Sequence, residues 1–183
     1  MARLYLVRHG RAEAGFGEAS DPGLDALGRM QAEEVATRLA PLGPLSLRTS
    51  PLRRARETAA PLETLWKRAA SVDPFVAEIP SPTADLAGRA AWLRQFMKGS
   101  WRDADFALAQ WREELIGSLG TIEEDTVIFS HFVAINVAVG AAMGDDRAVV
   151  FAPENCSVTV LEASGGKLIL VEKGQEGTWT KVN

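Results

Sequence analysis

The stretch Leu4-Tyr5-Leu6-Val7-Arg8-His9-Gly10 contains the strongest indication of how this chain folds. Its first four residues form a short apolar run, which is typical of a strand buried on both faces of a sheet. An arginine, a histidine and a glycine follow at once, so these groups stand at the carboxyl end of the strand. Open α/β sheets place their ligand sites at this edge. The stretch therefore predicts a reactive site at the end of a first buried strand.

The second of the chain's two histidines repeats this arrangement. Ser130-His131 follows the apolar run Thr126-Val127-Ile128-Phe129, which is again typical of a buried strand. A third polar segment, Ser50-Pro51-Leu52-Arg53-Arg54-Ala55-Arg56-Glu57-Thr58-Ala59, follows a short strand predicted over 45–49. Because the carboxyl ends of parallel strands meet at one edge of a sheet, we expect all three segments to open onto the same cleft.

Apolar residues at helical spacing predict helices between and after these strands. The helices are expected after the cap Asp25, after Ser50-Pro51 as cap and first residue, over 85–97, over 103–119, and from about Val133. The first helix is expected to bury Leu27, Met30, Val35 and Leu39. A weak strand is predicted over 72–76, and Ser164-Gly165-Gly166 predicts a hairpin between strands 158–161 and 168–171. Strands that alternate with helices indicate an α/β fold with a mostly parallel sheet.

Composition excludes several classes of protein. A chain of 183 residues with 46% hydrophobic content predicts a single domain over residues 1–183. Its formal net charge of -4 argues against a nucleic-acid partner. The longest apolar stretch, 132–143, is too short to cross a membrane, and a single cysteine, Cys156, fits a reducing compartment. We therefore expect a cytoplasmic protein that binds neither nucleic acid nor membrane.

Two histidines and several arginines in one cleft suit an anionic substrate that gives up a phosphoryl group. Guanidinium groups match phosphate oxygens and stabilise the charge that develops in the transition state. A neutral imidazole is a good nucleophile toward phosphorus, and neighbouring arginines favour the neutral form because they repel a second positive charge.

The three segments together resemble the signature of the histidine phosphatase superfamily, also called phosphoglycerate mutase-like. That signature is an Arg-His-Gly triplet that closes the first strand, a Ser-x-Leu-x-Arg-Ala-x-x-Thr-Ala segment that opens the second helix, and a late Ser/Thr-His. All three occur here in this order, and the resemblance covers essentially the whole chain. It implies a three-layer α/β/α sandwich and a phosphomonoester phosphatase that needs no metal or other cofactor.

The resemblance also implies a role for each matching residue. His9 would be the nucleophile that becomes phosphohistidine, and Arg8 and Arg54 would bind the phosphoryl group. His131 would be the second histidine of the phosphate pocket, where it stabilises the group in transfer. Members of the family usually carry an acid after the third strand, and Glu78 is the best match. Ile79-Pro80-Ser81-Pro82 replaces the usual glycine-containing stretch there, so Asp73 and Glu57 stay open as alternative acids.

Other functions remain open at this point. A phosphoglycerate-type mutase and a protein phosphohistidine phosphatase share this pocket, so the partner would be a small phosphorylated substrate or a phosphoprotein. A catalytically weak module that only binds a phosphorylated ligand would keep the same residues. His9, His131 and Glu78 could also form a metal-binding triad, although neighbouring arginines would repel a cation.

Two further features have both a functional and a structural interpretation. The segment from Gly88 to Arg112 interleaves cations with aromatic residues, which suits a lid over the cleft, a patch that stacks bases, or a helix core with a solvated outer face. Asn155, which precedes a predicted strand, either orients the site or forms a turn.

Overall fold

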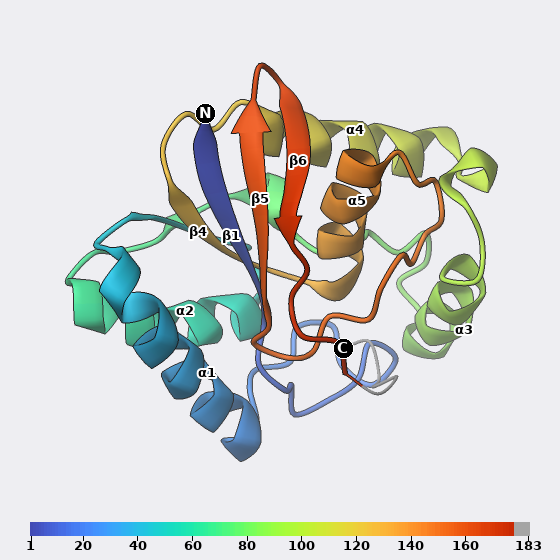
Figure 1. Ribbon diagram of the computed structural model, residues 1–183. Helices are drawn as coiled ribbons and strands as arrows, with labels where there is room; N and C mark the ends of the chain where they lie inside the picture. The colour runs from blue at the N-terminus through green and yellow to red at the C-terminus, as the bar shows by residue number, and fades with distance from the viewer. Residues whose placement is uncertain (178–183) are drawn as a thin grey trace.

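The computed structural model describes residues 1–177, in which helices cover both faces of one six-stranded sheet (Figure 1). The strands are β1 (Ala2–Arg8), β2 (Ser46–Thr49), β3 (Ser71–Val72), β4 (Thr126–Ser130), β5 (Val158–Ser164) and β6 (Lys167–Glu172). The α-helices are α1 (Ala26–Leu39), α2 (Arg53–Trp66), α3 (Leu86–Phe96), α4 (Phe106–Gly120) and α5 (Phe132–Met143). Short 3-10 helices are η1 (Ala40–Leu42), η2 (Pro74–Val76) and η3 (Trp101–Asp103).

The strand order is β3-β2-β4-β1-β5-β6. The first four strands of this order are parallel, whereas β5 runs antiparallel to β1 and forms the predicted hairpin with β6. In the register of the central strands, Arg8 lies opposite Ser130, and Thr49 lies opposite Phe129. The predicted α/β fold with a mostly parallel sheet is confirmed, and the carboxyl ends of β1, β2 and β4 lie at one edge.

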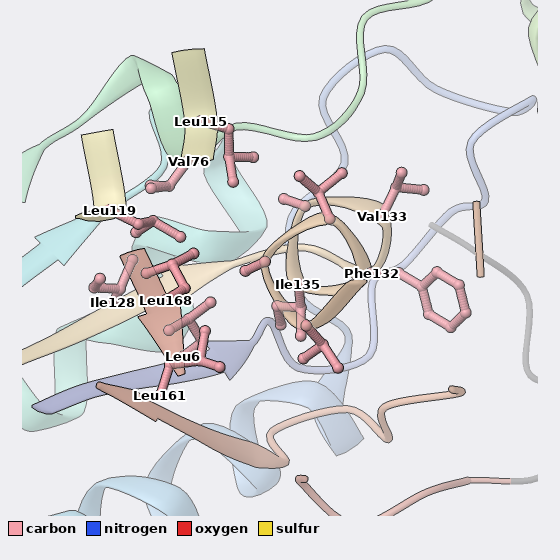
Figure 2. Close-up of a cluster of buried hydrophobic side chains, with 14 of the residues drawn as sticks. Leu6, Val76, Leu115, Leu119, Ile128, Phe132, Val133, Ile135, Leu161 and Leu168 are labelled. Atoms are coloured by element: carbon pink, nitrogen blue, oxygen red, sulfur yellow. The ribbon is translucent and has the colours of Figure 1, made fainter. Parts of the chain in front are cut away.

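Each face of the sheet has its own hydrophobic core. Side chains alternate along β4, so that Ile128 packs on one face while Val127 and Phe129 pack on the other. Helices α1 and α2 cover the face of Val127, and α4 and α5 cover the face of Ile128 (Figure 1). Figure 2 shows this second core, where strand residues such as Ile128 pack beside α4. The layers form the three-layer α/β/α sandwich that the resemblance implies.

Helix α5 is the most deeply buried helix of the described chain. Its residues from Phe132 to Gly140 are all buried, which matches an apolar sequence without a polar face. Asn136 is the polar residue in this buried run, and its side-chain oxygen accepts hydrogen bonds from the backbone N–H groups of Val150 and Phe151. Within residues 1–177, neither α5 nor any other helix has the length and apolar character that a membrane crossing requires.

The predicted inner face of α1 is partly wrong. Leu27 and Met30 are 39% and 62% exposed, whereas Val35 and Leu39 are buried as expected. The other buried positions of the helix are the small residues Gly28, Ala32 and Ala36. They are small because the chain approaches α1 closely: a Cβ built on Gly28 would clash with the backbone carbonyl of Arg11.

Two predicted boundaries also differ from the structure. Helix α2 begins at Arg53 rather than directly after Ser50, and its N-cap position is Leu52. The hydroxyl of Ser50 is engaged elsewhere, as described below. The weak strand predicted over 72–76 ends at Val72, because Asp73 accepts a hydrogen bond from the Phe75 N–H and starts the 3-10 helix η2.

Candidate active site

The edge of the sheet brings the three predicted segments together. The backbone N–H of His9 donates to Ser130 O (3.0 Å), and that of Ser50 donates to Phe129 O (3.0 Å). The imidazole rings of His9 and His131 have their centroids 5.2 Å apart. Because the three strands are parallel and in register, residues more than 100 positions apart in sequence meet at a single point, as predicted.

The imidazole of His9 is held in one tautomer. Its Nδ1 lies 2.7 Å from the carbonyl oxygen of Gly10, which can only accept a hydrogen bond. Nδ1 therefore carries a proton, and the lone pair of the neutral ring is on Nε2. The Nε–H of Arg54 donates to this Nε2 at 3.2 Å. The nitrogen available for nucleophilic attack thus lies in contact with a guanidinium group.

Arg54 and the His9 loop are joined through Thr58, one turn further along α2. The hydroxyl of Thr58 donates to Arg54 O (2.7 Å) and accepts from the N–H of Gly10 (3.0 Å). Burial lowers the pKa of Arg54, and the nearby positive charge of Arg89 lowers it further, while Glu78 and Asp21 oppose this. Thr58 belongs to the sequence motif, but only the structure reveals this bridging contact.

His131 is fully buried and neutral. Burial, followed by the positive charges of Arg54 and Arg8, holds the pKa of His131 well below its usual range. Its Nε2 lies 2.8 Å from the hydroxyl of Ser50, and that hydroxyl accepts from the N–H of Leu52 (3.1 Å). The Ser50 hydroxyl thus links His131 to the start of α2, and the other ring nitrogen, Nδ1, is a buried atom with no hydrogen-bond partner among residues 1–177.

Glu78 lies at the N-terminus of α5. Its Oε1 accepts from the backbone N–H groups of Ile79 (3.0 Å), Val133 (3.1 Å) and Ala134 (3.2 Å), and its Oε2 lies 3.2 Å from Val133 N. The first turn of a helix favours such a carboxylate through its free N–H groups and its dipole. Burial nevertheless raises the pKa of Glu78, while these hydrogen bonds and Arg54 act in the opposite direction. The carboxyl group is thus able to hold a proton and to release it.

Arg8 is anchored by the chain that leads into β5. Its Nη1 donates to Pro153 O (2.8 Å), and its guanidinium carbon lies 5.2 Å from the centroid of the Phe132 ring. Burial lowers the pKa of Arg8 to about 10, so the group keeps its positive charge at neutral pH.

The same segment holds the backbone of the histidine loop. The Asn155 side chain donates to His9 O (2.9 Å), and the Cys156 N–H donates to Arg8 O (2.9 Å). Of the two interpretations open for Asn155, the structure therefore favours orientation of the site. Burial raises the pKa of the Cys156 thiol to about 12, which keeps it protonated and unreactive.

Two charged residues of the site, Arg54 and Glu78, line a cavity of about 190 Å³. Its other lining residues include Phe16, Ser20, Ser81 and Arg89. The two imidazoles have no exposed surface, and His9 is in contact with Arg54.

The two alternative acids lie outside this cavity. Asp73 pairs with Arg48 (3.2 Å) and caps η2, and Glu57 accepts from the Leu24 N–H (2.6 Å) and pairs with Arg53 (2.7 Å). The metal-binding triad is not formed either. Within residues 1–177 no group of three histidine, cysteine or acidic side chains is placed to hold a metal ion, and the Glu78 oxygens face the amides of α5.

Comparisons with known proteins identify the family and the fold. The sequence model of the histidine phosphatase superfamily (branch 1) matches residues 4–175, whereas no curated protein sequence matches significantly. Among solved structures, mycobacterial glucosyl-3-phosphoglycerate phosphatase is 22% identical, with a TM-score of 0.73 over 97% of this chain and 100% of that chain. Phosphoserine phosphatase from Entamoeba histolytica, in complex with 3-phosphoglyceric acid, is also 22% identical, with a TM-score of 0.73 over 96% of this chain and 98% of that chain. The two structures confirm the fold, and the family match over most of the sequence shows that the chain belongs to the histidine phosphatase superfamily (branch 1).

Proposed function

We propose that this protein is a phosphatase that hydrolyses phosphomonoesters through a phosphohistidine formed at His9 Nε2. The observation that carries the proposal is the fixed tautomer of His9, which places the lone pair of Nε2 beside Arg54. Two charged arginines, Arg8 and Arg54, and the neutral ring of His131 would surround the phosphoryl group. Such groups stabilise charge that develops on phosphoryl oxygens and need no rearrangement during the reaction.

The reaction has two steps. In the first, His9 Nε2 attacks phosphorus, a nitrogen–phosphorus bond forms, and the bond from phosphorus to the ester oxygen breaks. Glu78 gives its proton to the departing oxygen, which leaves as an alcohol. In the second step, Glu78 takes a proton from water, whose oxygen attacks phosphorus. The nitrogen–phosphorus bond then breaks, and His9 is restored as inorganic phosphate leaves.

A small phosphorylated molecule is the favoured substrate. The cavity beside Arg54 and Glu78 is about 190 Å³, smaller than the pockets that hold drug-sized ligands. The similar solved structures include a glucosyl-3-phosphoglycerate phosphatase and a phosphoserine phosphatase, whose names refer to small phosphorylated compounds.

We also propose that residues 1–183 form one domain and that the protein is cytoplasmic, in keeping with its single, buried cysteine.

The proposal is tested with p-nitrophenyl phosphate and the variant His9→Ala. The variant should lose turnover because it lacks the nucleophile, while EDTA should leave the wild-type rate unchanged because arginine and histidine supply the positive charge. The matched control is Arg94→Ala, which alters an exposed side chain on α3. Thermal unfolding of both variants checks that they fold. Undiminished turnover in a folded His9→Ala variant, or inactivation by EDTA, would contradict the proposal.

A further inference from the structure

Arg89, in the first turn of α3, is a partly buried cation beside the candidate site. It lines the cavity that Arg54 and Glu78 also line, and its Nε is buried without a hydrogen-bond partner in the part of the chain that the structure describes. No carboxylate of residues 1–177 lies within ion-pair distance of it, unlike Arg48, Arg53 and Arg147, which each pair with an acid. A partly buried, unpaired guanidinium is costly to the fold.

The position of Arg89 is nevertheless fixed. Its guanidinium carbon lies 4.3 Å from the centroid of the Phe16 ring, a cation–π contact with a side chain that is itself buried. Phe16 comes from the loop after β1, so this contact joins that loop to α3. The arrangement holds Arg89 toward the cavity although its positive charge repels Arg54 and lowers the pKa of that residue.

The charges that border the cavity are unequal. Arg54 and Arg89 are both positive. Glu78 is the acidic residue that lines the cavity with them, and its carboxyl group accepts hydrogen bonds from the amides of α5. In the proposed reaction the phosphoryl group would lie at His9, where Arg8 and Arg54 neutralise its charge. Arg54 contacts His9 and also lines the cavity, and Arg89 lines the same cavity, so Arg89 is left to face the rest of the substrate.

We propose that Arg89 binds a second anionic group, carried by the leaving part of the substrate. This inference rests on the proposed phosphatase function and adds a substrate class to it: phosphomonoesters that also carry a carboxylate or a second phosphate. Guanidinium groups recognise both anions through paired hydrogen bonds. Within the segment from Gly88 to Arg112, Arg89 thus lies at the cleft, as the lid interpretation expects. The aromatic residues Trp92, Phe96 and Trp101 of the same segment instead pack in the core.

The test uses two pairs of substrates that differ in the second anion. In the first pair, 3-phosphoglycerate is compared with glycerol 1-phosphate, which has a hydroxymethyl group in place of the carboxylate. In the second, fructose 1,6-bisphosphate is compared with fructose 6-phosphate. The measured quantity is the ratio of kcat/KM within each pair, for the wild type and for Arg89→Met. Arg94→Met, on the exposed side of the same helix, is the matched control.

We expect the wild type to prefer the acidic member of at least one pair. Arg89→Met should reduce that preference about ten- to a hundredfold, as for a lost hydrogen bond between charged groups. Arg94→Met should preserve the preference and should change hydrolysis of p-nitrophenyl phosphate less than about threefold. The pair that responds identifies the second anion as carboxylate or phosphate.

Three results would overturn the inference. They are a wild type without preference in either pair, a preference that survives Arg89→Met, and an equal loss on every substrate, which would place Arg89 on the phosphoryl group itself. A wild type that hydrolyses none of the substrates, p-nitrophenyl phosphate included, would contradict the phosphatase function instead, so the two failures are distinguishable.

Discussion

Replacing Glu78 by glutamine should separate the two steps of the proposed reaction. The substitution preserves the shape of the side chain, and its remaining oxygen can still accept from the amides of Ile79, Val133 and Ala134. The new NH₂ group would replace the Oε2 that lies 3.2 Å from Val133 N. One weakened hydrogen bond of this kind costs about 1 kcal/mol, so Glu78→Gln should remain folded.

The effect on catalysis should be much larger, because an amide does not donate a proton to a leaving oxygen. Proton transfer by a positioned side chain contributes about 10²–10⁴-fold, which corresponds to about 3–5 kcal/mol of the barrier. With an alkyl phosphate, Glu78→Gln should be slow from the first turnover. With p-nitrophenyl phosphate, whose leaving group needs no proton, the first step should stay fast and the second should be slow. Rapid mixing should then show a burst of p-nitrophenolate followed by a slow steady state.

The pH dependence gives an independent check. Because burial raises the pKa of Glu78, the protonated acid should persist to higher pH than an ordinary glutamic acid would. The rate of the first step on an alkyl phosphate should therefore fall as the pH rises through that raised pKa, and Glu78→Gln should lose this dependence. A glutamine variant with wild-type steady-state turnover of an alkyl phosphate would refute the assignment of Glu78 as the acid.

Two further predictions concern positioning and packing. Imidazole ¹⁵N spectra are simple because the chain has two histidines, and they should show a neutral His131 ring at neutral pH, since burial and Arg54 lower its pKa. Ser50→Ala should shift the Nε2 resonance of His131, which lies 2.8 Å from the Ser50 hydroxyl, and Ser50→Thr should preserve it. A positively charged His131 ring at neutral pH would contradict the assignment. Gly28→Ala should destabilise the protein by about 1–3 kcal/mol in a thermal melt, because the added Cβ meets the Arg11 backbone. Gly117→Ala, in an exposed part of α4 with no atom within 4 Å of the added Cβ, should instead stabilise it by about 0.5–1 kcal/mol; a Gly28→Ala variant as stable as this control would refute the packing argument.

The positions of His9 and His131 at strand ends could be predicted because the same short sequence pattern marks both. A buried apolar run followed by His9 or His131 defines a position at the edge of a parallel sheet, and the register of β1 and β4 then brings the two together. Glu78 was also singled out from the sequence, and the structure places its carboxyl group against the amides of α5 and in the lining of the cavity beside Arg54. Its role as the acid stays a prediction.

Other features depend on contacts that no sequence pattern contains. Leu27 and Met30 fit a helical stripe, but the close approach of the Arg11 backbone to α1 selects the face with Gly28 instead. The bond from Asn155 to His9 O spans 146 positions, and the cation–π contact of Arg89 with Phe16 joins α3 to the loop after β1. Such features follow from tertiary packing, so only the structure reveals them.

The most direct test of the proposed reaction is to locate the covalent phosphate. The protein is mixed with ³²P-labelled phosphoester, preferably as Glu78→Gln, and quenched at alkaline pH, where phosphohistidine survives. Peptide mapping should then place the label on the peptide that contains His9, attached at Nε2, because Nδ1 is bonded to Gly10 O. His9→Ala should carry no label, and a label on the peptide of His131, or one retained in His9→Ala, would contradict the mechanism.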